Sequence, residues 1–92
     1  MRIEGDTIIF KSVDTYFVKE KDGRKPNTVR ILDEHESGIV YNRWYSGSLK
    51  KIRIELITSE SPDSFERELT DITWCGSAFG RDYVIFSWRH EE

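Results

Sequence analysis

The 92-residue sequence has one cysteine, two histidines, two prolines and no long hydrophobic run. A single cysteine cannot form an internal disulfide, which favours a reducing compartment such as the cytoplasm. One cysteine and two histidines also fall short of the donor sets that bind zinc, so we predict neither a metal site nor a cofactor. The apolar run Ile8–Phe10 is too short for a secretion signal or a membrane span. We therefore expect a cytoplasmic protein without a membrane partner.

Positive charge is also scarce overall, since the formal net charge is −3 at pH 7. Tight binding to long nucleic acid requires many phosphate contacts from lysine and arginine, so no DNA partner is expected. Aromatic residues are plentiful by comparison, with three tryptophans, four tyrosines and five phenylalanines. Their large buried areas make one compact core feasible, and we expect residues 1–92 to form a single domain. The oligomeric state is not indicated.

Lysine and arginine are concentrated in one segment, residues 19–30. Five of them lie there against two carboxylates, Glu20 and Asp22. Charge runs of this kind are most often solvated surface. On an acidic protein, however, a local cationic site suits a defined anionic or polar ligand better than a long polyanion. The segment is therefore the first candidate for a functional site.

A strand is predicted near the start of the chain, and a short helix is predicted between this strand and Gly23. The strand is the β-rich run Thr7–Phe10. Ser12 is a suitable N-cap for the helix, and Gly23 is well placed to end it about ten residues later. Three apolar residues at helical spacing would form the buried face of the helix: Val13, Tyr16 and Phe17.

A second strand, over residues 28–32, is predicted directly after the helix. Pro26 disfavours helix at Lys25 and pushes the backbone toward extended geometry. Because alternate residues of a strand point to opposite faces, Thr28 and Arg30 would lie side by side, with Lys25 at the start of the strand. The two apolar residues of the other face would meet the core: Val29 and Ile31.

The rest of the chain reads as strands separated by loops and a turn. Loops are expected at residues 33–38 and 58–64, a turn at 46–48, and strands at 39–41, 51–57, 65–74 and 83–88. The 65–74 segment would also fit a short helix, although its β-branched second half favours strand. The nearly all-apolar 83–88 strand would be covered on both faces. Together these elements predict an α+β fold, a small mixed-sheet β-barrel with one or two short helices.

The segment from Gly23 to Arg30 resembles a family motif. Domains of the ASCH family carry Gly-x-Lys-x-x-Glu-x-Arg after a strand and a short helix, and Gly23, Lys25 and Arg30 match it. Thr28 stands where the family often has Glu. One bacterial branch, the small N4-acetylcytidine amidohydrolases, also has Thr there. Its motif is similar to five residues of this chain: Gly23, Arg24, Lys25, Thr28 and Arg30.

The resemblance implies a PUA-like barrel whose cleft is lined by the motif, with a modified nucleoside or RNA as ligand. It also implies that Lys25 and Thr28 are catalytic. The substrate-binding residues that it implies are three: Gly23, Arg24 and Arg30. In the amidohydrolase branch the Lys and Thr act with a Glu farther along the chain, and no residue here aligns convincingly with that Glu.

The residue types of the motif suit amide hydrolysis. Thr28 would attack the amide carbonyl, Lys25 would accept the hydroxyl proton, and Arg30 would stabilise the developing oxyanion. An acidic partner would orient Lys25. Three carboxylates of the 65–74 segment are available for this role: Glu66, Glu68 and Asp71.

Two other functions remain open. A non-catalytic RNA- or nucleotide-binding module would place Lys25 and Arg30 on phosphate. Its bases would stack on one of three neighbouring aromatic residues, although such a cluster is more often core or hairpin packing: Tyr41, Trp44 and Tyr45. A small accessory protein acting through a protein partner would hold no ligand in the cleft.

Two further residues, Cys75 and His35, are assigned structural rather than functional roles. Cys75, next to Trp74, is interpreted as a buried small hydrophobe rather than a reactive thiol. His35 lies among acidic neighbours, but adjacent carboxylates on one loop rarely converge on one ion. We therefore expect a solvated loop there and no metal.

Overall fold

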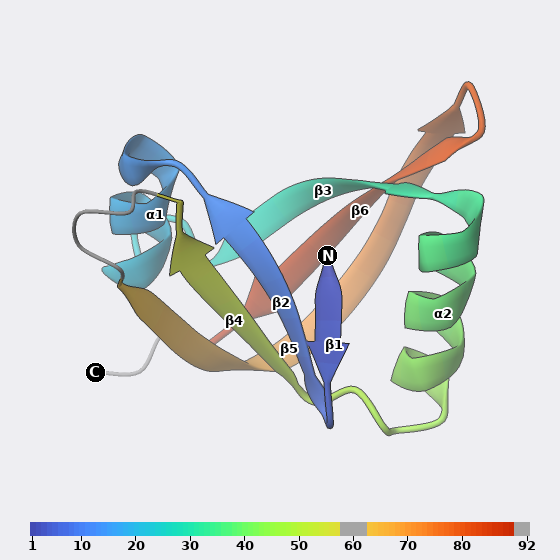
Figure 1. Cartoon of the computed structure of the whole chain (residues 1–92), viewed down its shortest axis with the longest axis horizontal. Helices are drawn as coiled ribbons and strands as arrows, with labels where there is room; N and C mark the ends of the chain where they lie inside the picture. Colours follow the sequence, from blue (N-terminus) through green and yellow to red (C-terminus); the bar gives the residue numbers. More distant parts are fainter. Residues whose placement is uncertain (58–62, 90–92) are drawn as a thin grey trace.

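The computed structural model describes residues 1–57 and 63–89, and at positions 14 and 15 it describes only the backbone. These ranges contain six strands and two helices: β1 (Arg2–Glu4), β2 (Thr7–Ser12), α1 (Asp14–Lys21), β3 (Asn27–Asp33), α2 (Glu34–Tyr45), β4 (Lys51–Leu56), β5 (Ser64–Ala78) and β6 (Arg81–Trp88). Helices α1 and α2 lie at opposite ends of the molecule (Figure 1). Neither helix is long and apolar enough to cross a membrane.

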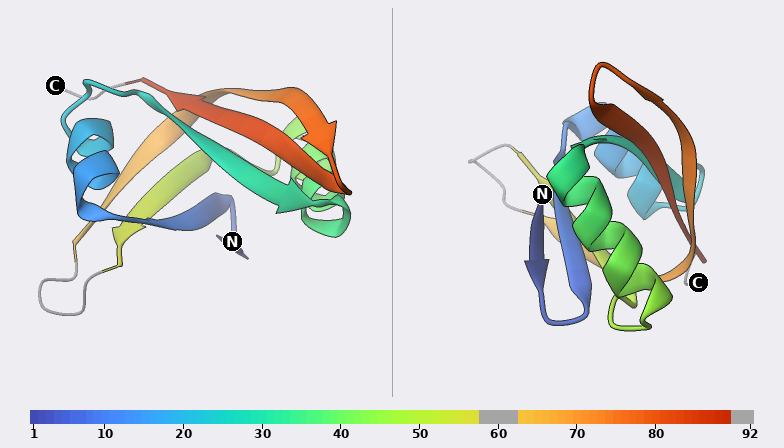
Figure 2. Two further views of the ribbon diagram at one scale, coloured as in Figure 1. Left: turned by 90° about the horizontal axis from the view of Figure 1, so that it is seen from above. Right: turned by 90° about the vertical axis from the view of Figure 1, so that its right-hand side faces the viewer.

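The strands form one mixed sheet in the order β1-β2-β4-β5-β6-β3. The β2–β4 pair is parallel, and the other neighbouring pairs are antiparallel. The first part of β5 pairs with β4 and the remainder with β6, so the sheet bends over along this one strand (Figure 2). The edge strands are β1 and β3, and they do not pair with each other. The predicted mixed sheet with short helices is confirmed, but the sheet is not closed into the predicted barrel.

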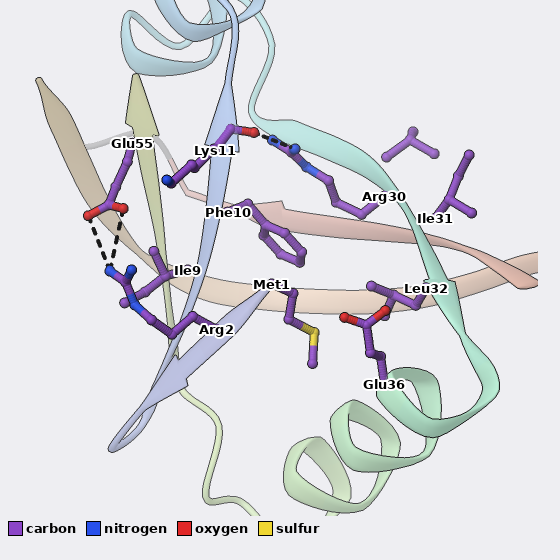
Figure 3. Close-up of a pocket in the computed structure, with 11 residues that line it drawn as sticks. Met1, Arg2, Ile9, Phe10, Lys11, Arg30, Ile31, Leu32, Glu36 and Glu55 are labelled. Atoms are coloured by element: carbon purple, nitrogen blue, oxygen red, sulfur yellow. Dashed lines mark hydrogen bonds and ion pairs between the residues drawn. The ribbon is translucent and has the colours of Figure 1, made fainter. Parts of the chain in front are cut away.

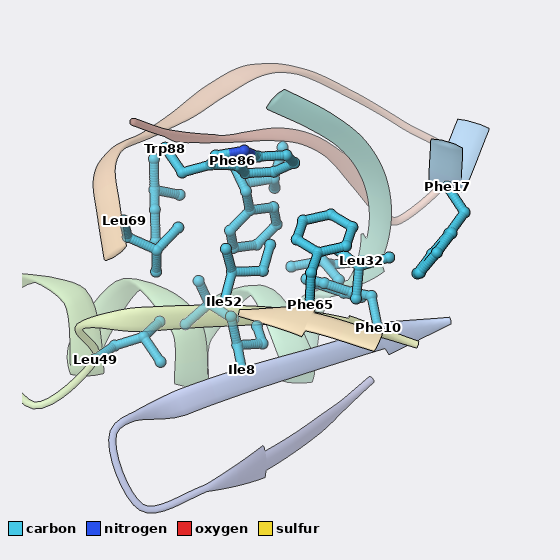
Figure 4. Packing of buried hydrophobic residues seen from close by; sticks show 14 residues of the cluster. Ile8, Phe10, Phe17, Leu32, Leu49, Ile52, Phe65, Leu69, Phe86 and Trp88 are labelled. Atoms are coloured by element: carbon cyan, nitrogen blue, oxygen red, sulfur yellow. The ribbon is translucent and has the colours of Figure 1, made fainter. Parts of the chain in front are cut away.

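The hydrophobic core lies between the two halves of the bent sheet (Figure 4). Five of its members from the sheet are completely inaccessible to solvent: Ile8, Ile52 and Ile54 from one half, and Val84 and Phe86 from the other. Helix α1 adds Phe17, whose ring centroid lies 5.4 Å from that of Phe65. Helix α2 adds Val40, which is also fully buried. Each helix thus covers one end of a core that the sheet alone leaves open.

Strand β3 turns toward the core the face opposite to the one predicted. Thr28 and Leu32 are buried, whereas Val29 and Ile31 are 51% and 54% exposed. The pairing with β6 explains this, because Thr28 lies opposite the fully buried Phe86 and therefore shares its inward face. The prediction that the two apolar residues meet the core is wrong. The prediction that Thr28 and Arg30 share a face is confirmed.

Residues 34–45 are a helix, so the predicted loop at 33–38 and strand at 39–41 are wrong. Asp33 is the N-cap, and its carboxylate accepts a hydrogen bond of 2.8 Å from the backbone N–H of Glu36. The Glu36 carboxylate in turn accepts from the backbone N–H of Asp33 at 3.3 Å. This reciprocal arrangement is a capping box, which satisfies backbone donors that the first turn leaves unpaired. The buried side of the helix carries Ser37 and Val40.

The start and the buried face of α1 also differ from the prediction. The N-cap is Val13, without a side-chain cap, and the Ser12 hydroxyl instead donates to the Glu20 carboxylate at 3.4 Å. Phe17 and Glu20 are the buried residues of the described helix side chains, whereas Val13 and Tyr16 are exposed. The face that α1 turns inward therefore contains a carboxylate.

Three differences concern the C-terminal hairpin. β5 is a strand throughout, which decides between the two readings of 65–74, and it continues past Gly76 to Ala78. In β6 only alternate residues are buried, so the predicted cover on both faces is wrong. Cys75 is exposed and its thiol donates to the carbonyl of Tyr83, which makes the prediction of burial wrong. The predicted strand at 51–57 and turn at 46–48 are confirmed, while 58–62 of the predicted loop lie outside the described residues.

The orientation of β3 can be tested with two neighbouring variants. Leu32→Ala removes a side chain that is 2% exposed, and it should lower the free energy of unfolding by about 2–5 kcal/mol. Ile31→Ala truncates a half-exposed side chain and should cost under about 1 kcal/mol. Urea unfolding followed by tryptophan fluorescence measures both. The opposite ranking would contradict the inward face described above.

Candidate functional site

Lys25, Thr28 and Arg30 line one cleft of about 400 Å³. The cleft lies where α1, the end of β2 and the start of β3 meet. Two residues of α1 also line it, Tyr16 and Glu20. The three side chains that the sequence singled out therefore converge on a single hollow.

The turn after α1 brings Lys25 to the cleft. The helix ends at Lys21, and Gly23 follows with a φ of 89°, a left-handed conformation that glycine adopts without steric cost. The backbone N–H of Lys25 then donates to the carbonyl of Lys19 at 3.0 Å, which closes the turn on the helix. The Lys25 ammonium lies 5.0 Å from the centroid of the Tyr16 ring, a cation–π contact. Within the described chain no carboxylate forms an ion pair with it.

Arg30 is held by contacts on three sides. Its Nε donates to the Thr28 hydroxyl at 3.0 Å, and its Nη1 donates to the backbone carbonyl of Lys11 at 2.7 Å. The guanidinium carbon lies 4.9 Å from the centroid of the Phe10 ring. Burial lowers the pKa of Arg30, and the carboxylate of Glu20 opposes this change. Arginine remains protonated under such conditions, so a fixed positive charge sits beside Thr28.

Thr28 is buried but lines the cleft, and its oxygen accepts the bond from Arg30. The hydroxyl donates no hydrogen bond to another described residue, so its hydrogen can be donated to a ligand or transferred. A guanidinium at hydrogen-bond distance also stabilises negative charge that develops on the threonine oxygen. This arrangement suits a hydroxyl that reacts or that orients a polar ligand.

Glu20 is a residue that the sequence analysis missed as a member of the site. It is fully buried, Oε1 accepts from Ser12, and Oε2 has no hydrogen-bond partner among the described residues. Burying an unpaired carboxylate oxygen is costly, so such a group calls for an explanation. The available signal was its spacing, three residues after the core residue Phe17 and four after Tyr16, which places it on the helix side that faces the sheet.

The other residues predicted for the site lie elsewhere. Arg24 forms an ion pair of 2.8 Å with Asp22 on the surface and does not line the cleft. Gly23 does not line it either and acts through the turn that positions Lys25. Their predicted roles in substrate binding therefore gain no support from the geometry.

None of the three carboxylates proposed to orient Lys25 lines the cleft. Glu66 lies 4.0 Å from Lys51, and Asp71 accepts a hydrogen bond of 2.6 Å from Thr73. Glu68 lines a separate hollow beside Trp44. Glu20 is the carboxylate that the fold brings into the cleft in their place.

The aromatic residues expected to stack on a base are also separated from the cleft. Tyr41, Trp44 and Tyr45 belong to α2, at the other end of the molecule (Figure 1). Trp44 packs against the core, and the two tyrosines line a different groove. The aromatic ring available to a ligand in the cleft is that of Tyr16.

A second cavity of about 680 Å³, here called the seam cavity, lies on the other side of Arg30. It occupies the open side of the sheet, with β1 and β2 on one side and β3 on the other (Figure 3). Arg2 and Lys11 line it with Glu36 and Glu55, and Arg2 lies 3.4 Å from Glu55. Arg30 lines both hollows, so its side chain forms part of the wall of each.

The cleft thus combines a hydroxyl, an amine, a guanidinium and a buried carboxylate with one aromatic wall. Such a set suits a small polar ligand with a flat ring. Comparison of the chain with protein-family models, with curated proteins and with solved structures finds no match. The resemblance to the ASCH family accordingly rests on the motif itself.

Removing the Arg30 contacts should lower the stability of the fold more than a matched substitution at the surface does. Arg30→Met keeps much of the aliphatic stem over Phe10 but removes both hydrogen bonds, and it should lower the free energy of unfolding by about 1–3 kcal/mol. Arg24→Met removes an exposed ion pair and should change it by less than about 1 kcal/mol. Chemical denaturation of the two variants measures the difference. Equal effects would show that the Arg30 contacts contribute little.

Proposed function

We propose that the cleft binds a nucleoside-type ligand and hydrolyses the amide of an N4-acylated cytidine. The observation that carries the proposal is the Oε2 atom of fully buried Glu20, which has no hydrogen-bond partner among the described residues and belongs to a residue that lines the same cleft as Lys25, Thr28 and Arg30. A ligand that donates a hydrogen bond to this oxygen would remove the cost of leaving it unpaired. The exocyclic N–H of an acylated cytosine is such a donor.

The motif supports the same assignment. Its Lys-x-x-Thr-x-Arg spacing resembles that of the small ASCH amidohydrolases, and the three side chains share one cleft. A cytoplasmic ASCH domain with a PUA-like fold is accordingly part of the proposal. The open sheet and the presence of Glu20 on α1 are features of this chain that the resemblance did not indicate.

The proposed reaction uses groups that line the same cleft. The Thr28 oxygen attacks the acyl carbon, and its proton passes to the Lys25 nitrogen, which acts as the base. The C–N bond then breaks, and the leaving amino group takes the proton from Lys25, which releases cytidine. Water hydrolyses the acyl-threonine ester, restores the hydroxyl and releases the carboxylic acid. Arg30 stabilises the charge around the reacting oxygen, and Tyr16 offers a face for the pyrimidine ring.

A second function, nucleotide or RNA binding without catalysis, is favoured by a different observation. Lys25 forms no ion pair with a carboxylate among the described residues, and the neighbouring seam cavity is lined by the cations Lys11 and Arg2, the latter beside Glu55. A phosphate-bearing ligand would contact these cations. The binding of such a ligand would not depend on the hydroxyl of Thr28.

Turnover of N4-acetylcytidine tests the first function directly. We expect the wild type to release acetate, and Thr28→Ala and Lys25→Met to reduce kcat/KM by about 10²–10⁴-fold, because nucleophile and base are lost. Thr28→Ser should retain partial activity, and the exposed Thr70→Ala serves as the matched control. A wild type without turnover excludes the hydrolase. RNA binding that weakens with salt and survives Thr28→Ala would then support the second function.

Glu20→Gln distinguishes a ligand contact from a structural role. The amide has the same shape but presents a different hydrogen-bonding pattern, so we expect binding of N4-acetylcytidine to weaken at least about tenfold. Thermal unfolding should show no loss of stability, because a buried charge is removed. A lower Tm with unchanged ligand affinity would instead assign Glu20 a purely structural role.

A further inference from the structure

We propose that a groove between α2 and the β5–β6 hairpin binds a small organic cation with a trimethylammonium group. This α2 groove has a volume of about 750 Å³ and lies apart from the motif cleft, at the opposite end of the molecule. Six of its lining residues carry the argument: Glu34, Ser37, Gly38, Tyr41, Trp74 and Asp82. The proposal is independent of the function proposed for the cleft.

The walls of the groove are aromatic. The ring centroid of Tyr41 lies 4.6 Å from that of Tyr45 and 5.5 Å from that of Trp74. Tyr41 is 51% exposed and Tyr45 is 67% exposed, so both rings remain available to a ligand. Aromatic faces attract a cation through their quadrupole, and quaternary ammonium groups are recognised in proteins by such aromatic surfaces.

The charge of the groove has a single sign. Glu34 and Asp82 line it, and no lysine or arginine does. The three other hollows described above are each lined by lysine or arginine, which makes this groove the one of the four suited to a positively charged ligand. The negative lining therefore adds to the attraction that the rings supply.

The aromatic wall is held in place from beneath. The indole Nε1–H of Trp74 donates to the Ser37 hydroxyl at 3.0 Å, and this hydroxyl donates to the carboxylate of Asp82. Ser37 itself is buried, and both bonds are partly buried. The indole is thereby fixed before a ligand arrives, which lowers the entropic cost of binding.

Packing within the protein does not explain why position 38 is glycine. It lies inside α2 and lines the groove, and a Cβ added there would meet no atom within 4 Å. Glycine destabilises a helix interior relative to alanine, and no left-handed backbone requires it here. A missing side chain beside the two tyrosines keeps open a volume that a ligand can fill.

NMR titrations of the full chain test the proposal with choline, with Nα-acetyl-Nε-trimethyllysine amide, and with 3,3-dimethylbutanol. The alcohol is a neutral carbon isostere of choline. We expect at least one of the cations to shift the indole N–H signal of Trp74, with an affinity at least about tenfold above that of the alcohol. The signals of Trp44 and Trp88 serve as internal references. Tighter binding of choline indicates a free metabolite as ligand, and tighter binding of the lysine derivative indicates a modified side chain.

Two variants separate binding from folding. Gly38→Ala should raise or preserve the Tm and weaken cation binding at least about fivefold, because the methyl group occupies the groove. Tyr41→Leu should weaken it about tenfold. Val18→Ala, an exposed change on α1, should leave it unaltered. Equal affinity for the alcohol, no shift with either cation, or undiminished binding by Gly38→Ala would each overturn the proposal.

Discussion

The guanidinium of Arg30 connects the edge strand β3 to the end of β2 that β1 does not cover. β1 covers β2 only as far as Ile9, so the carbonyl of Lys11 lies beyond its reach and is free to accept from Arg30. The same side chain holds the Thr28 hydroxyl and forms a wall common to the cleft and the seam cavity. A backbone ladder here would have closed the barrel and filled the space that a ligand needs. One side chain thus substitutes for a row of backbone hydrogen bonds.

Local signals in the sequence were sufficient to predict those elements that depend on contacts between residues near one another in the chain. Gly23 ends α1 as its position indicated, and the strand predicted at 51–57 is present as β4. The capping box of Asp33 and Glu36 was also legible, since an acceptor at the N-cap and Glu three residues later mark a helix start. It was missed, and residues 33–38 were interpreted as a loop and 39–41 as a strand.

Contacts between segments distant in the sequence determine which residues are buried, and the sequence patterns did not indicate these contacts. The inward face of β3 depends on its register with β6, and that register buries a threonine while it exposes Val29 and Ile31. Glu20 looked like one more surface charge in a charged run, and only the packing of α1 against the sheet reveals it as buried. The meeting of Tyr41 with Trp74 likewise requires the complete fold.

Strand β5 belongs to both halves of the molecule, with β4 as its partner as far as Glu68 and β6 from Leu69 onward. A shift of register between Leu69 and Asp71 marks the changeover. Inserting or deleting one residue at this point would reverse the sides of every later β5 side chain, because the strand repeats every two residues. Ile72 would turn to solvent and Thr73 to the interior. Natural length variation should therefore avoid this position and accumulate in the connections at the ends of the strand.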